Sequence, residues 1–347
     1  MKTTLFDYQL PDGHIANSSV SPRDHSKLMV IDRNNGEIIH KHFYDIINYL
    51  TENDVLVLND TKVFPARVFG QKETGGKVEI LLNKSLNKLT WEALCKPGIK
   101  IGTKVIFGEF YAEVIHRNSE IHILKFNINK VELLEKLQKV GITPLPPYIH
   151  NSEKESSIRK KYQTTYAKDV GSVAAPTAGF HFTKELLKKI KNKDIRIEYV
   201  TLHVGLGTFM PIKTDRLEDH VMHSEEFFIE PETLKRLKKY KKENKRIISV
   251  GTTATRVLES IAVGNTNGST DIFLKPPYKF KFVDALITNF HLPKSTLLAL
   301  VSAFVSFPNT KHRFIDFKNT VVGKAYMEAI KNNYRFYSFG DSMMISG

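Results

Sequence analysis

Four segments of this sequence place chemically useful side chains directly after an apolar run. In chain order they supply Asn59, Asp60, Thr61 and Lys62; His203 and Gly205; Thr252, Thr253 and Arg256; and Asn289 with His291. Together they offer an acid, imidazoles, hydroxyls, an amide and a guanidinium. Such groups suit general acid–base chemistry on a substrate that carries a carboxylate or phosphate.

A fifth segment, "GSVAAPTAGFHFT" (residues 171–183), is uncharged and nearly without side-chain bulk until it reaches His181. The small residues Ala175, Thr177 and Gly179 let a flat ligand or another backbone come close. Thr183 has the position of a helix N-cap, and a helix start there favours an anion. Tight packing of a helix on a sheet would explain the same composition.

Each group also has a purely structural explanation. Asn and Asp make turns routinely, threonines cap helices, and a single histidine on an apolar strand such as His203 is commonly a hydrogen-bonded core residue. The segment His220-Val-Met-His223-Ser-Glu225 resembles metal ligation, but its histidines are three apart and the glutamate lies outside them. We therefore expect no metal, and a general acid–base role for His223 or Glu225.

The elements that position these groups follow from the patterning. Apolar strands ending in the four segments alternate with helices, which favours a largely parallel sheet covered on both faces. Ligands bind at the carboxyl ends of the strands in such sheets. The coincidence of four polar strand ends is the strongest physical indication of a site, and Ser295 is the expected cap of the last long helix.

Residues 63–128 have a different pattern, with short β-branched and aromatic runs separated by turns, which is typical of a small barrel or sandwich. A helix and the Pro-rich segment "GITPLPPYI" follow. We therefore predict a discontinuous three-layer α/β domain, residues 1–62 plus 150–347, with a small β-barrel domain, residues 63–149, inserted into it.

Composition limits the class of protein. The 347 residues include one cysteine and carry a formal net charge of +14. The lone cysteine and the lack of a long apolar run favour a cytoplasmic protein with no membrane segment. The basic segment 232–246 reads as a surface helix whose lysines can bind a polyanion. The lysines selected for that role are Lys235, Lys238, Lys239 and Lys242.

As a set, nine ordered segments resemble the S-adenosylmethionine:tRNA ribosyltransferase-isomerase family of queuosine biosynthesis. They include "FDYQLPDGHIA", "LNDTKVFPAR", "GSVAAPTAGFHFT", "VTLHVGLGTFMPI", "HVMHSE", "GTTATRVLES" and "VDALITNFHLPKSTLLALVSAF", and they run from Phe6 to Ile345. The resemblance implies an α/β domain with an inserted barrel and a cytoplasmic monomer. It also implies that no metal or other cofactor is needed.

The resemblance further implies that S-adenosylmethionine is a substrate. Its ribosyl part is transferred to 7-aminomethyl-7-deazaguanine at the wobble position of tRNAs with G-U-N anticodons and is isomerised there. Epoxyqueuosine-tRNA forms, and adenine and methionine leave. On this reading His203, with Asp60 or Glu225, transfers protons and His181 lies near the leaving adenine. The residues predicted to bind substrate are Lys62, Arg67, Ala175, Thr177, Gly179, Gly205, Thr252, Thr253, Arg256, Asn289 and His291.

The sequence departs from the family pattern at a few positions. Lys27 stands where arginine is usual, Pro277 where glycine is usual, Lys275 where an aromatic is common and Ala299 where methionine is usual. Lysine lacks the bidentate fork of arginine, so an anion contact at position 27 would be weaker. Two alternatives remain open: a catalytically silent tRNA-binding relative, and a metal-dependent hydrolase using His220, His223 and Glu225.

Overall fold

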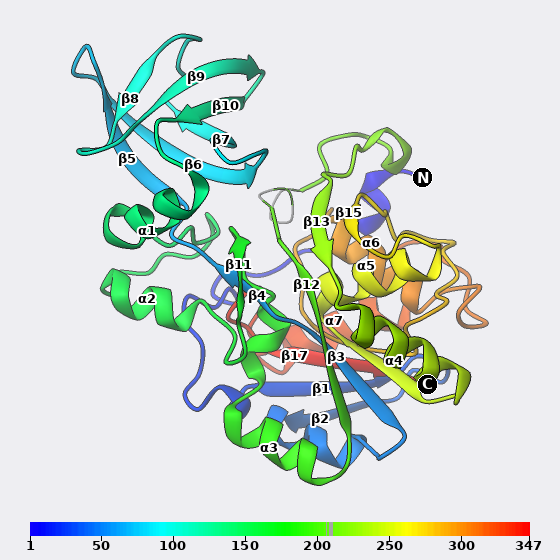
Figure 1. Cartoon of the computed structure of the whole chain (residues 1–347). Helices are drawn as coiled ribbons and strands as arrows, with labels where there is room; N and C mark the ends of the chain where they lie inside the picture. The colour runs from blue at the N-terminus through cyan, green and yellow to red at the C-terminus, as the bar shows by residue number, and fades with distance from the viewer. Residues whose placement is uncertain (206, 208–210) are drawn as a thin grey trace.

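A computed structural model describes residues 1–205, 207 and 211–347; residues 206 and 208–210, within the quoted segment 200–212, lie outside the described part. Its main feature is a nine-stranded mixed sheet in the order β15-β13-β12-β3-β14-β16-β17-β1-β2 (Figure 1). The strands are β1 (Lys27–Asp32), β2 (Ile38–His42), β3 (Asp54–Asn59), β12 (Arg196–Leu202), β13 (Glu225–Phe228), β14 (Arg246–Val250), β15 (Gly268–Thr270), β16 (Ala285–Asn289) and β17 (Ser342–Ser346).

The expectation of a largely parallel sheet holds for its centre. Strands β12, β3, β14 and β16 are mutually parallel, and these are the strands whose ends carry the four polar segments. Outside them, β13, β15, β17 and β2 each add an antiparallel pairing. The parallel centre brings the polar strand ends to one edge of the sheet.

Alternating side chains of the central strands pack into two apolar layers, one on each face of the sheet. On β3, Val55 and Val57 pack into the larger core under the helices α5 (Gly251–Ala262), α6 (Thr296–Phe304) and α7 (Val321–Lys331). Leu56 and Leu58 point to the opposite face, against α3 (Lys184–Asn192) and the 3₁₀ helix η3 (Phe43–Tyr49). This period-two alternation with helices on both faces makes the domain a three-layer α/β structure.

The inserted segment forms a closed six-stranded antiparallel barrel, as expected, in the order β10-β7-β6-β5-β8-β9. Its strands are β5 (Arg67–Lys72), β6 (Lys77–Ser85), β7 (Thr90–Lys96), β8 (Lys104–Ile106), β9 (Tyr111–Asn118) and β10 (Ile121–Phe126). Val78, Ile80 and Leu82 alternate into its core, and α1 (Lys130–Val140) adds Leu133 and Leu137.

Short segments join the barrel to the sheet. The chain leaves β3, forms β4 (Thr61–Val63) and enters the barrel; it returns through α2 (Glu155–Lys161) to β11 (Asp169–Ser172), which pairs with β4. The 3₁₀ helices η1 (Thr3–Phe6), η2 (Arg23–His25), η4 (Thr177–His181) and η6 (Leu217–Asp219) complete the described elements with α4 (Pro231–Lys242). The exact domain limits at 62/63 and 149/150 stay a prediction.

The caps predicted from sequence are confirmed. Thr183 accepts a hydrogen bond from the backbone N–H of Leu186, and Ser295 accepts one from Leu298. Leu237 of the basic helix α4 is fully buried while its lysines face outward. Within the described residues, the longest helices have 12 residues, and none is long and apolar enough to cross a membrane.

Candidate functional site

Hollows lie side by side at the carboxyl edge of the central strands. The first, called here the inner pocket, lies over the ends of β14 and β16. Six of the residues predicted to bind substrate line it: Ala175, Thr177, Thr252, Thr253, Asn289 and His291. Its polar lining also includes Tyr148, Thr288, Tyr337 and Ser338. The structure therefore brings together groups that were predicted from three separate segments of the sequence.

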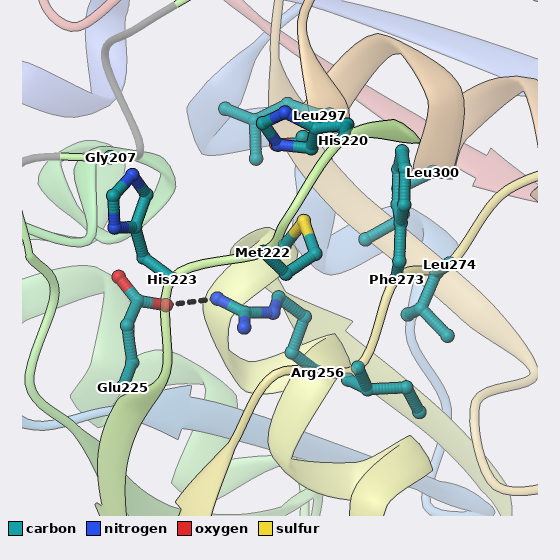
Figure 2. Close-up of a pocket in the computed structure, with 12 residues that line it drawn as sticks. Gly207, His220, Met222, His223, Glu225, Arg256, Phe273, Leu274, Leu297 and Leu300 are labelled. Carbon is teal, nitrogen blue, oxygen red and sulfur yellow. Dashed lines mark hydrogen bonds and ion pairs between the residues drawn. The ribbon is translucent and has the colours of Figure 1, made fainter. Parts of the chain in front are cut away.

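The second hollow, the central pocket, has apolar walls and a charged pair. Figure 2 shows His223 and Glu225 on one side, Phe273 and Leu274 on the other, and Arg256 reaching toward Glu225 between them. The other residues that line it are Gly207, His220, Met222, Ile272, Thr296, Leu297 and Leu300. A charged pair beneath a thioether and aliphatic side chains suits a ligand with an apolar body and a zwitterionic end.

The third hollow, called here the interdomain cavity, is open to solvent and has a volume of about 780 Å³ between the barrel and the sheet edge. The sheet side contributes His203, Gly205, His223 and Glu225. The barrel side contributes residues of β6, β7, β9 and β10. Its size is in the range of pockets that hold small-molecule ligands.

The three hollows adjoin. Leu297 lines both the inner and the central pocket, and His220, His223 and Glu225 line both the central pocket and the interdomain cavity. The three hollows are therefore neighbours at the sheet edge, and the inner and central pockets are small, about 60 Å³ and 30 Å³.

Glu225 and Arg256 are the closest charged pair in the site. Nη1 of Arg256 donates to Oε2 of Glu225, Nη2 donates to the carbonyl of Thr270 at 3.1 Å, and the N–H of Gly205 donates to Oε1 of Glu225 at 2.9 Å. The Nε of Arg256 is buried and has no hydrogen-bond partner among the described residues. The two residues were predicted separately, as a substrate anchor and a proton carrier, and the structure makes them one unit.

His203 is placed for proton transfer. Its Nδ1 lies 2.8 Å from Oγ1 of Thr61, and its Cε1–Nε2 edge lies over Gly171, where a Cβ would come within 2.7 Å of the ring. Nε2 has no hydrogen-bond partner among the described residues, and His203 lines the interdomain cavity. Burial lowers the pKa of His203, so the neutral, basic form predominates at neutral pH.

His181 is placed differently from the expectation. Its Nδ1 lies 2.7 Å from Oγ of Ser26, and its Nε2 lies 3.2 Å from Nδ2 of Asn289. The amide N–H₂ can only donate, so Nε2 accepts and Nδ1 carries the proton. Burial lowers the pKa of His181 to about 3, which keeps it neutral. Both ring nitrogens are thus used inside the protein, which argues against contact with a leaving base and assigns His181 to positioning Asn289.

Asn289 and His291 are held by the strand end. Oγ1 of Thr177 donates to Oδ1 of Asn289 at 3.2 Å, while Nε2 of His291 lies 2.9 Å from Oγ1 of Thr288. Burial lowers the pKa of His291 to about 3. Nδ2 of Asn289 also donates to the carbonyl of Asp341 at 3.2 Å, so Oδ1 is the atom of this amide that keeps capacity for a further hydrogen bond. Both side chains are therefore fixed and uncharged where they line the inner pocket.

Five of the predicted catalytic and substrate-binding residues line none of the three hollows: His181, described above, and Asp60, Lys62, Arg67 and Gly179. Asp60 accepts from Oγ1 of Thr201 at 2.7 Å, and burial raises its pKa. Arg67 is in barrel strand β5, 3.2 Å from Glu79 of the neighbouring strand, because the chain has already entered the barrel there. Lys62 is an exposed residue of β4, and Gly179 is packed against Tyr166. The structure therefore does not bring Asp60, Lys62 and Arg67 together with the predicted residues that line the hollows, and their roles stay a prediction.

The predicted RNA-binding lysines are exposed on α4, but they lie far from the hollows. Lys242 comes four residues before β14 begins, so it lies toward the amino edge of the sheet, and Figure 1 shows α4 and the barrel at opposite ends of the molecule. Three lysines line the interdomain cavity instead: Lys84, Lys130 and Lys213. They come from three distant segments, and no local cluster in the sequence points to them.

Two further groups are structural. Glu259 is fully buried and accepts hydrogen bonds from the backbone N–H groups of Lys281, Phe282 and Val283, which fixes the loop before β16. Lys27 donates to the carbonyl of Asn332 at 2.7 Å and so covers the end of α7. The departure from arginine at position 27 therefore weakens no anion contact in the described structure.

The hydrolase alternative needs ligands that converge on a metal. Among the described residues, no three His, Cys, Asp or Glu side chains are grouped so that they could hold one. Glu225 is instead paired with the guanidinium of Arg256. The glutamate that this hypothesis needs as a ligand is thus already paired with a cation of the protein.

Comparison with known proteins agrees with this architecture. Residues 3–345 match the family described as queuosine biosynthesis protein. A protein of Thermosipho melanesiensis named S-adenosylmethionine:tRNA ribosyltransferase-isomerase is 47% identical over 353 residues, covering 99% of this chain and 100% of that protein. The crystal structure of S-adenosylmethionine tRNA ribosyltransferase from Thermotoga maritima is 36% identical, covers 98% and 99% of the two chains and has a TM-score of 0.55. The chain therefore belongs to the queuosine biosynthesis family of ribosyltransferase-isomerases.

Proposed function

We propose that this enzyme transfers the ribosyl part of S-adenosylmethionine to 7-aminomethyl-7-deazaguanine at the wobble position of tRNA and isomerises it to epoxyqueuosine. Adenine and methionine are the other products, and the reaction needs no metal or further cofactor. The observation that carries the proposal is the row of three adjoining hollows. Their linings match, in order, a nucleoside, an amino-acid tail and a base extruded from RNA.

The inner pocket suits the adenosine part. Helix α5 begins at this pocket without a side-chain cap on Val250, so its first N–H groups remain available to ligand oxygens. Thr252 and Thr253 add hydroxyls there, and Asn289 and His291 add neutral edges for a base or sugar. A neutral lining suits adenine and ribose, which carry no charge.

The central pocket suits the methionine part. Its apolar walls can cover the methylene and S-methyl groups, while Arg256 binds the carboxylate and Glu225 binds the ammonium group. A zwitterion adds no net charge to a buried pair that is already neutral, which limits the desolvation cost. In this assignment Glu225 is a binding residue and leaves proton transfer to the imidazoles.

The chemistry needs one base near the ribose carbon bonded to the sulfonium, where the inner and central pockets meet, and a second base beside the acceptor amine. The sulfonium acidifies the adjacent ribose carbon, and a positioned base must take that proton. His223 lines both the central pocket and the cavity, so we assign this step to it. The acceptor amine must lose a proton as its nitrogen bonds to the sugar carbon, and Nε2 of His203 in the cavity is assigned to that proton.

A release assay tests the proposal. The protein is incubated with S-adenosylmethionine and tRNA that carries 7-aminomethyl-7-deazaguanine, and free adenine, free methionine and the mass of the modified base are measured. Equal amounts of adenine, methionine and heavier base are expected. Binding of both substrates without release of adenine would instead support the silent tRNA-binding alternative, and activity that requires an added metal would support the hydrolase.

A further inference from the structure

The barrel wall of the interdomain cavity carries an apolar patch beside a carboxylate. Leu94 of β7 is paired in register with Ile121 of β10, and Glu92 with Ile123. All four side chains line the cavity and are partly exposed, because their neighbours Trp91, Ala93 and Cys95 point into the barrel core. Three aliphatic side chains and one carboxylate thus form a continuous surface on adjacent strands.

The carboxylate of Glu92 is only partly engaged. Its Oε2 accepts a hydrogen bond from Nδ2 of Asn83 at 3.3 Å, and its Oε1 has no partner among the described residues. Lys84 is paired in register with Glu92, but its ammonium group lies 3.5 Å from Glu226 across the cavity. Glu92 therefore keeps acceptor capacity toward the cavity.

We propose that this barrel surface, rather than the sheet, recognises the target base: the base packs on Leu94, Ile121 and Ile123, and Glu92 accepts hydrogen bonds from its N1–H and 2-amino groups. The inference rests on the proposed function, because it takes the acceptor to be a 7-substituted deazaguanine. A guanine-type edge offers two parallel donors to a carboxylate. An adenine-type edge presents an acceptor at N1, which Glu92 repels.

The barrel wall and the sheet wall of the cavity carry groups that suit opposite edges of the proposed base. In a 7-deazaguanine the 7-substituent is on the opposite side of the ring system from N1 and the 2-amino group. Glu92 lies on the barrel wall, whereas His203 and His223 line the sheet side. A base held by Glu92 therefore directs its aminomethyl group toward the two imidazoles, where the proposed reaction needs it.

The test uses two chemically synthesised anticodon stem-loops. One carries 7-aminomethyl-7-deazaguanine, and the other carries the same base without its 2-amino group. The wild-type enzyme is expected to lose roughly tenfold in kcat/KM when that group is removed. Glu92→Gln is expected to lose roughly tenfold on the full base but to discriminate less than about threefold between the two stem-loops. The KM for S-adenosylmethionine should not change.

Glu113→Gln is the matched control, because Glu113 is a barrel-strand glutamate in register with Lys104 and Lys125 and does not line the cavity. It should keep the full discrimination. Anisotropy measurements of stem-loop binding give the same comparison without turnover. Discrimination that survives in Glu92→Gln overturns the inference while adenine release leaves the proposed function intact. A wild-type enzyme that releases no adenine with either stem-loop overturns both.

Discussion

Glu225 and Arg256 form an ion pair in which the side chains are only 5% and 8% exposed. Glu225 comes from β13, the second strand from the β15 edge of the sheet, and Arg256 comes from the first turns of α5. The pair therefore joins the antiparallel part of the sheet to the helix behind its centre. A buried pair of this kind is costly to break from one side, since the remaining charge loses its partner but stays out of water.

The first prediction follows from the cost of removing only one member of this ion pair. Glu225→Gln should lower the free energy of unfolding by about 3 kcal/mol, because Arg256 is left buried without a counter-charge. The double variant Glu225→Met with Arg256→Met should recover much of that loss while binding no S-adenosylmethionine. Urea denaturation and calorimetric binding measure the two effects. Glu232→Gln, in an exposed pair with Lys235, should change stability by less than about 0.5 kcal/mol. An equally small change in Glu225→Gln would contradict the pair's structural role.

The second prediction concerns acid stability. Burial lowers the pKa values of His181 and His291 to about 3, below the value of about 6.5 that an unfolded chain has. Between those values the unfolded state binds protons that the folded state does not, so stability falls as pH falls. Each histidine adds about 1.4 kcal/mol per pH unit to this slope.

Removing one of these histidines isolates its contribution. His181→Gln should flatten the dependence of the unfolding free energy on pH by about 1.4 kcal/mol per unit between pH 6 and pH 4. Ser26→Ala, which removes the hydrogen-bond partner of His181 without removing the titrating group, should lower stability and keep most of the slope. Urea denaturation at each pH gives both numbers. An unchanged slope in His181→Gln would show that the imidazole is protonated in the folded state.

Local sequence patterns predicted the framework of the site well. Thr183 and Ser295 cap helices because each hydroxyl accepts a hydrogen bond from the backbone N–H three residues later. This short-range pattern can be recognised in the sequence. The ends of β14 and β16 also lie together as expected, since parallel strands bring their carboxyl ends to one edge. These features depend on periodicity and short-range hydrogen bonds, which a single sequence contains.

Local sequence patterns could not predict contacts between residues that are far apart in the chain. His181 was expected beside a ligand, but Ser26, 155 residues away, takes one of its nitrogens. Arg67 was grouped with Asp60, yet the chain crosses into the barrel between them and Glu79 becomes its partner. Such outcomes depend on which segments meet in the fold, and nothing near His181 or Arg67 in the sequence specifies those partners.

The third prediction concerns His203 as a base. His203→Ala should reduce kcat by about 10²- to 10⁴-fold, as expected for loss of a positioned proton acceptor. Burial lowers the pKa of His203, and its neutral form is the active one. The wild-type rate should therefore hold at neutral pH and fall only as pH drops through that lowered pKa, below about 6.5.

Thr61→Val gives a matched comparison for His203. It removes the hydrogen bond to Nδ1 but keeps the imidazole, so kcat should fall less than in His203→Ala while the acidic limb of the pH profile remains. Stopped assays of adenine release from pH 5 to pH 8 supply the profiles. Normal turnover in His203→Ala would eliminate this residue as a base and leave His220 and His223, the two imidazoles that border both the central pocket and the cavity, as candidates.

The fourth prediction separates two basic surfaces. Replacing Lys84, Lys130 and Lys213 with Ala should weaken tRNA binding, because these residues line the cavity that we propose as the site of the target base. The slope of log affinity against log salt should fall by about 0.7 for each phosphate that the variant no longer neutralises. Replacing Lys235, Lys238, Lys239 and Lys242 removes one more charge in total. If only lysines close to the candidate site determine the affinity for tRNA, this second variant should bind tRNA nearly as tightly as the wild type.

The comparison of these two variants distinguishes a local interaction from a general attraction. Net charge acts over the whole surface and would make the α4 variant the weaker binder, since it loses four charges rather than three. Direct binding of phosphates at the cavity would make the cavity variant weaker despite its smaller charge loss. Binding measured by anisotropy at several salt concentrations separates the cases. A reduced salt slope confined to the α4 variant would return tRNA docking to the basic helix and require the tRNA to span from there to the cavity.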